Sequence, residues 1–160
     1  MIGHLGFSYI GLIYIIMLTV PNIIWARNIP DWHDQSGENT ILMVFERIGQ
    51  VLCVPAIIIF SDYNPRILEP WTVVLIASAA LMILYEVFWI RYFRSKQTIK
   101  DFYQDLFGIP IPGASLPVAA FLLLGIYGKV IWLIISAIIF GIGHIGIHLQ
   151  HVRVQALGEK

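Results

Sequence analysis

Five long apolar stretches alternate with short polar segments along the chain. A helix needs roughly 20 predominantly apolar residues to cross the hydrocarbon core of a bilayer. Each stretch approaches that length without a run of charges inside it. The pattern therefore predicts five membrane-spanning helices, over about residues 5–25, 41–60, 71–90, 110–127 and 130–149.

The connections between these stretches carry local signals of their own. Asn39 or Thr40 is placed to cap the second span, and Gly128 with Lys129 predicts a tight turn between the last two spans. The longest connection is too polar to cross a membrane, yet its apolar residues recur at helical spacing from Ile99 to Phe107. We expect a short amphipathic helix over about residues 98–107, lying on the membrane surface.

Composition agrees with this pattern. Hydrophobic residues make up 58% of the chain, charged residues only 12%, and the mean hydropathy is +0.79, which excludes a soluble globular domain of this size. The formal net charge of zero gives no support for nucleic acid as a partner, so membrane lipids are the expected surroundings. We predict an all-α integral membrane protein, a single domain over residues 1–160, with a five-helix bundle and an interfacial helix between spans three and four.

The distribution of basic residues predicts the orientation. Arg91, Arg94, Lys96 and Lys100 lie together after the third span, and such clusters remain on the cytoplasmic side. Five spans then place the N-terminus outside and the C-terminus in the cytoplasm. Of the ten basic residues, Arg66 and Lys129 alone lie outside in this arrangement.

Polar residues from separate spans fall at one depth. At 1.5 Å per residue, they lie roughly 5–9 Å inside the cytoplasmic leaflet, beside the proline-broken start of the fourth span. Ionisable groups are costly in a membrane and usually face a shared interior site. We therefore predict a cytoplasm-facing polar cavity lined by Asn22, Glu46, Arg47, Glu86, His144 and His148.

The charged members of this layer need partners. Glu46 and Arg47 are neighbours about 100° apart on a helix, so each should pair with a residue on another helix. Glu86 is the candidate partner of Arg47, and His144 or His148 that of Glu46. The two glutamates could serve as a general acid and base, or form structural ion pairs with Arg47 and Arg91.

Three of the five histidines form a stripe on the last span. His144, His148 and His151 are spaced four and three residues apart and so share one helix face. With Glu86, the first two have the ligand chemistry of a divalent metal site, although no HExxH motif is present. The alternative, which we favour, is that His144 is bonded to a glutamate in the core and the other two lie at the headgroup level.

Two further features concern packing. Ala137 and Gly141 continue the histidine face as small residues, which permit close helix approach inside the bundle or across a homo-oligomer. Tryptophans near predicted span ends are typical of an aromatic belt at the membrane interface, namely Trp25, Trp71, Trp89 and Trp132.

Several segments resemble those of small bacterial membrane proteins without an assigned function. The resemblance rests on GHLGFSYIGLIYIIML, PNIIW, LMVFERIGQVL, LYEVFWIRYFRS and GHIGIHL, and it extends over nearly the whole chain. It implies a bacterial cytoplasmic membrane and one compact domain, and it assigns no catalytic residue.

Three functions remain compatible with these observations. The first is a non-enzymatic protein that binds a small ligand, a lipid headgroup or an ion in the predicted cavity. The second is a membrane-embedded enzyme acting on a lipid or isoprenoid through glutamate and histidine acid–base or metal chemistry. The third is a structural subunit whose polar layer only sets helix register.

Overall fold

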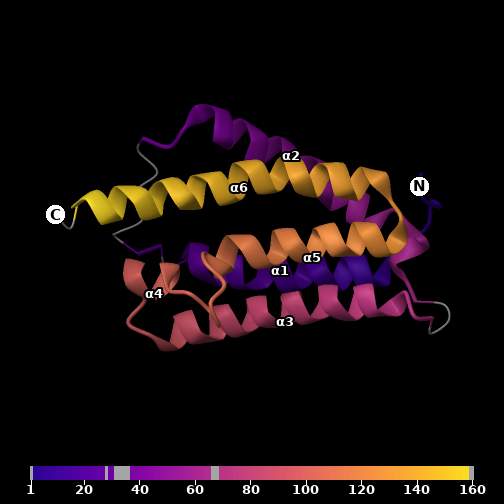
Figure 1. The fold of residues 1–160 in the computed structure, drawn as a ribbon, viewed down its shortest axis with the longest axis horizontal. Helices are drawn as coiled ribbons and strands as arrows, with labels where there is room; N and C mark the ends of the chain where they lie inside the picture. The colour runs from indigo at the N-terminus through magenta and orange to yellow at the C-terminus, as the bar shows by residue number, and fades with distance from the viewer. Residues whose placement is uncertain (1, 28, 31–36, 66–68, 159–160) are drawn as a thin grey trace.

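The computed structural model describes residues 2–27, 29–30, 37–65 and 69–158, and helices dominate this part of the chain. Five long helices run along the longest axis of the molecule (Figure 1). The predicted all-α bundle is confirmed. Its elements are α1 (Tyr9–Arg27), α2 (Thr40–Ile58), the 3-10 turn η1 (Ser61–Tyr63), α3 (Thr72–Arg94), α4 (Ile99–Tyr103), α5 (Pro112–Gly128) and α6 (Ile131–Gly158).

The long helices have the dimensions of membrane spans. Four of them, α1, α2, α3 and α6, are long and apolar enough to cross a bilayer, and α5 is apolar over 17 residues. The two termini lie at opposite ends of the bundle (Figure 1). We name these the Asn39 end, where α2 begins, and the Asp62 end, where α2 leads into η1.

Close backbone packing joins α2 to α6. A Cβ atom added to Gly49 would overlap the backbone of Phe140, and one added to Gly143 would overlap the backbone of Glu46. Helices within a membrane gain little from the hydrophobic effect, so close van der Waals packing at small residues is a main source of their association. The two glycines therefore set the separation and register of α2 and α6.

Helix α5 lies between α3 and α6. The buried hydroxyl of Ser78 on α3 donates to the carbonyl of Ala120 on α5 at 2.7 Å and accepts from Tyr14 of α1 at 3.0 Å. On α6, Ala137 has no exposed surface, and Gly141 packs against Val118 of α5. The Ala137/Gly141 face is thus covered within the chain, which leaves it no surface for contact with a second copy.

At the Asp62 end, the chain before α1 is bonded to the end of α2. The Gly6 and Ser8 amides donate to the Ile59 and Ile58 carbonyls at 2.9 and 2.8 Å. Ser8 also caps α1, because its hydroxyl oxygen accepts from the Gly11 amide at 2.8 Å. A Cβ atom at Gly11 would overlap the Ile57 carbonyl, so α1 and α2 are held in direct contact here.

The segment between α3 and α5 is helical as expected, but over five residues only. Thr98 and Asp101 form a reciprocal capping box at its start. Phe102 and Leu106 are 7% and 5% exposed, so this segment packs its apolar side chains into the bundle, and Phe107 alone of its large apolar residues is highly exposed. The expected apolar face toward lipid is therefore directed largely inward.

The aromatic belt is present only in part. Trp71 and Trp132 are 43% and 52% exposed, as residues of a belt would be. Trp89 is 3% exposed and packs among Tyr85, Phe88 and Tyr92 in the core. The prediction was wrong for Trp89 because distance from a span end does not reveal which helix face a residue occupies.

The α2–α6 contact can be tested with a matched pair of glycine substitutions. Gly143→Ala should lower the thermal unfolding midpoint in mild detergent, because the new methyl group meets helix backbone; overpacking of this kind costs about 1–3 kcal/mol. Gly146→Ala is the control, since its methyl group would meet only the flexible end of the Leu42 side chain. Equal midpoints for the two variants would contradict this account of the packing.

A second prediction concerns the Asp62 end. Burial raises the pKa of Asp62, but hydrogen bonds from the His4 backbone amide and ring outweigh it, and the net effect lowers the pKa below 3.8. A lowered folded-state pKa contributes stability above the ordinary carboxyl value, and that stability is lost as pH falls through the folded pKa. Asp62→Asn should therefore lower the thermal unfolding midpoint at neutral pH, and this difference from the unmodified protein should shrink as the pH falls below 3.8. A difference independent of pH would show that packing, not ionisation, is responsible.

Candidate functional site

A cavity of about 550 Å³ lies toward the Asn39 end of the bundle. Helices α1, α2, α3 and α6 form its walls, with single contributions from α4 and α5. Its surface is mainly apolar and aromatic, with a few polar groups. The lining residues are Leu18, Thr19, Asn22, Ile23, Trp25, Ala26, Glu46, Gln50, Val54, Tyr85, Trp89, Phe102, Gly113, Phe140, His144 and His148.

The arrangement of α1 and α2 explains why a cavity forms here. The two helices touch at Gly11 and Ile57, near the Asp62 end. Toward the Asn39 end, α2 rises away from α1 while it stays packed on α6 (Figure 1). Asn22 on α1 and Gln50 on α2 are exposed and line the space between the diverging helices. The cavity is therefore accessible along this side of the bundle.

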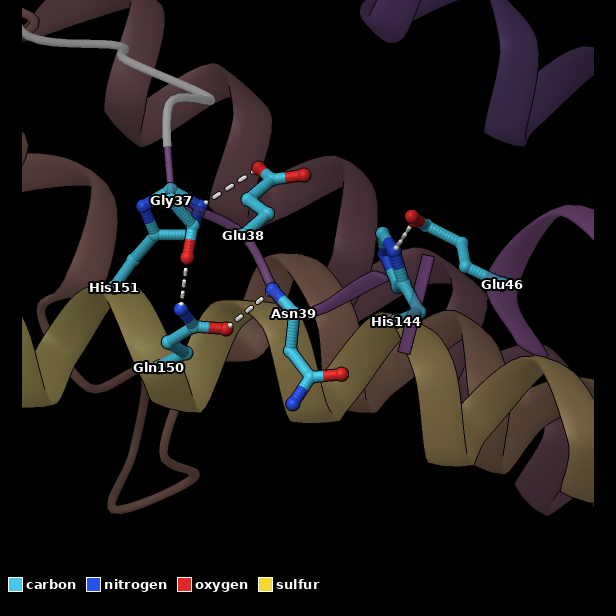
Figure 2. A network of polar contacts seen from close by, with 7 residues as sticks. All are labelled: Gly37, Glu38, Asn39, Glu46, His144, Gln150 and His151. Carbon is cyan, nitrogen blue, oxygen red and sulfur yellow. Dashed lines mark hydrogen bonds and ion pairs between the residues drawn. The ribbon is translucent and has the colours of Figure 1, made fainter. Parts of the chain in front are cut away.

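The central polar contact of the cavity is between α2 and α6. The Nδ1 atom of His144 lies 2.6 Å from Oε1 of Glu46 (Figure 2). The side chains are 19% and 22% exposed, so the pair is shielded yet reachable from the cavity. Of the two partners expected for Glu46, the structure selects His144. The neighbouring glycine, Gly143, brings the α2 backbone close enough for this short contact.

Aromatic rings hold both cavity histidines. The His144 ring stacks on Phe140 with a centroid distance of 4.7 Å and an interplanar angle of 16°. His148 stacks on Phe102 at 5.9 Å and meets the His144 ring edge-on at 4.8 Å. These contacts fix the orientation of each imidazole. His148, which was expected at the headgroup level, lies in the cavity wall, where Phe102 of α4 packs against it.

Asn22 adds a polar group from α1. Its amide nitrogen donates to the carbonyl of Leu18 at 2.7 Å and to the hydroxyl of Tyr85 at 2.8 Å. The bond to Tyr85 links α1 to α3 across one wall of the cavity. Asn22, Glu46, His144 and His148, four of the six predicted site residues, thus line one cavity.

Glu86 and Arg47 do not line the cavity, and the expected pair between them is wrong. On α3, Glu86 lies about 100° from Tyr85, toward the face of Ile83 and Ile90, which are 59% and 52% exposed. Its Oε1 atom is buried without a hydrogen-bond partner in the described part of the chain. Arg47 is exposed on α2, about 100° around the helix from Glu46, which contacts α6. The rotation of each residue about its helix axis, which the shared-cavity prediction required, was wrong.

The candidate metal site is not formed. Within residues 2–27, 29–30, 37–65 and 69–158, no three His, Cys, Asp or Glu side chains converge as metal ligands would. His144 and His148 are adjacent, but Glu86, the third predicted ligand, lies on another face of α3. The favoured alternative for His144, a histidine bonded to a glutamate, is the one that the structure contains.

Arg91 has a different role from the predicted ion pair with a glutamate. Its guanidinium donates to the carbonyls of Gln104 and Asp105 at 2.7 and 2.8 Å. These bonds fasten the segment after α4 to the end of α3. Phe102 is thereby held against His148 and the cavity wall.

A second polar cluster joins the beginning of α2 to the end of α6 (Figure 2). Nε2 of His151 lies 2.9 Å from Oε1 of Glu38. Gln150 donates to the Gly37 carbonyl at 2.7 Å and accepts from the Asn39 amide at 3.0 Å. This cluster lies outside the cavity and secures the helix pair that carries Glu46 and His144.

Sequence reasoning missed several cavity residues. Gln50 lies one turn after Glu46 and on the same face, so helical spacing was a sufficient signal for it. Tyr85 and Trp89 are four residues apart on α3 and therefore share one helix face. The prediction used the charged residue between them, Glu86, which lies on a different face. Phe102 had no such signal, because its place depends on how the α3–α5 connection folds back.

Comparisons with models of protein families, with curated proteins and with solved structures found no match.

The Glu46–His144 contact can be measured by a double-mutant cycle. Glu46→Ala and His144→Ala, alone and combined, should give a coupling energy of about 1 kcal/mol or more in unfolding experiments in mild detergent, since the pair is short and shielded. Gln50→Ala with His144→Ala is the control cycle, because no hydrogen bond joins these two residues, and its coupling should be near zero. Equal coupling in both cycles would contradict a specific Glu46–His144 interaction.

Proposed function

We propose that this protein binds a lipid or another small amphiphilic molecule in the cavity between α1, α2, α3 and α6. One observation carries the proposal: the 550 Å³ space combines an apolar and aromatic lining with the Glu46–His144 pair and Asn22. Binding sites for small molecules are commonly mostly apolar pockets with a few placed polar groups. The polar groups would hold the head of the ligand, and the side between α1 and α2 would accommodate its tail.

The distribution of basic residues supports an orientation for this site. Arg27, Arg91, Arg94, Lys96 and Lys100 all lie at the Asn39 end, whereas Lys129 lies at the Asp62 end. By the positive-inside rule, the Asn39 end faces the cytoplasm and the N-terminus lies outside. The resemblance to small bacterial proteins supports the cytoplasmic membrane of a bacterium as the location. The cavity would then receive its ligand from the cytoplasmic leaflet.

An enzyme acting on a lipid or isoprenoid is the second candidate, and the same pair favours it. A carboxylate on one imidazole nitrogen orients the ring and supports proton transfer at the other. Glu46 is placed to do this for His144. Chemical conversion of a bound lipid, followed by mass spectrometry, distinguishes this candidate from simple binding.

Two tryptophan substitutions on α1 test the binding site. Thr19 lines the cavity, whereas the next residue, Val20, is 49% exposed and does not. Thr19→Trp should lower the amount of copurified lipid seen by native mass spectrometry about tenfold or more, which corresponds to roughly 1.4 kcal/mol, and Val20→Trp should leave it unchanged. Lipid retained equally by both variants would place the ligand elsewhere. A protein that retains none would favour the structural-subunit alternative.

A further inference from the structure

The charge of the cavity restricts the ligands that suit it. Among the described residues that line it, Glu46 is the only one with a formally charged side chain, and none is a lysine or arginine. His144 shares its Nδ1 atom with Glu46, so the pair together carries a net charge of zero or minus one. An anionic headgroup would thus meet a carboxylate without a permanent positive charge to balance it.

Two basic residues close in sequence to cavity-lining residues, Arg91 and Arg47, do not alter this balance. The guanidinium of Arg91 is bound to two backbone carbonyls beyond α3 and lies 5.8 Å from the Phe88 ring. Arg47, although next to Glu46 in sequence, is exposed on another face of α2. Neither of them lines the cavity. Phosphate recognition, which depends on such residues, has no support here.

Aromatic side chains dominate the remainder of the wall. Trp25, Tyr85, Trp89, Phe102 and Phe140 come from four different helices and line the same space. The face of an aromatic ring carries partial negative charge and attracts cations, and groups of such rings recognise quaternary ammonium ions. A bulky cation of this kind donates no hydrogen bond, so it can approach Glu46 while His144 keeps its contact.

We infer that the ligand of this cavity is a lipophilic cation, with its positive charge between the Glu46 carboxylate and the aromatic wall. This inference rests on the proposed function and specifies its ligand class. The apolar side chains of Leu18, Ile23 and Val54 surround the remaining space and suit the hydrophobic part of such a molecule. Amphiphilic amines and quaternary ammonium or phosphonium compounds have this chemistry.

Two ions of the same shape and opposite charge provide the test. Tetraphenylphosphonium and tetraphenylborate are titrated into the purified full-length protein in non-ionic detergent, in a buffer of constant pH. Intrinsic tryptophan fluorescence reports binding, because Trp25 and Trp89 line the cavity. The cation should bind at least about tenfold more tightly than the anion.

Glu46→Gln should reduce cation affinity about tenfold or more, because it removes the only carboxylate among the described residues that line the cavity. Glu38→Gln is the matched control: its carboxylate also contacts a histidine of α6, but it lies outside the cavity. The comparison of the two ions on the unmodified protein remains decisive if Glu46→Gln does not fold.

The outcomes separate this inference from the proposed function. Equal binding of both ions, preference for the anion, or cation binding unaffected by Glu46→Gln overturns the inference. If lipid retention still depends on Thr19→Trp in that case, the cavity remains a binding site for another class of ligand. If neither ion binds and no lipid is retained, both proposals fail.

Discussion

The structure depends on the close backbone contact between α2 and α6. Gly49 and Gly143 remove the side chains that would keep these helices apart, and the polar cluster of Glu38, Gln150 and His151 secures the same pair at its end. In a membrane, where lipid tails solvate apolar side chains as well as a protein core does, such contacts determine helix association. The contact also sets the register that brings Glu46 to His144.

A second set of contacts determines the position of α1, and these contacts leave α1 and α2 apart at one end of the bundle. Hydrogen bonds between the chain before α1 and the end of α2, together with Gly11, hold α1 on α2 at the Asp62 end. Because α2 stays packed along α6, it diverges from α1 at the Asn39 end (Figure 1). Tight packing at one end therefore produces a cavity at the other. A polar layer that would otherwise be sealed in protein is left accessible.

The physical character of the cavity follows from this geometry. A shielded carboxylate–imidazole pair costs less when its members satisfy each other, and the stacked rings of Phe140 and Phe102 orient both histidines. The described residues of the remaining wall are mainly apolar and aromatic, and none is a lysine or arginine. These features favour an amphiphile over a soluble metabolite, and they motivate a cation as its head.

The sequence by itself determined the fold class and the helix on which each polar group lies. Apolar length, the Asn39 cap and the turn at Lys129 are local signals, and they placed the helices and the common layer of Asn22, Glu46 and His144. Only the tertiary structure decided which side of each helix faces the interior. One residue corresponds to a rotation of about 100° around the helix axis, which is why Glu86 and Arg47 lie outside the cavity while their neighbours Tyr85 and Glu46 line it. Helix rotation is set by contacts between residues distant in sequence, such as Gly143 with Glu46. In a span with apolar residues on every face, the sequence pattern does not indicate which face is directed inward.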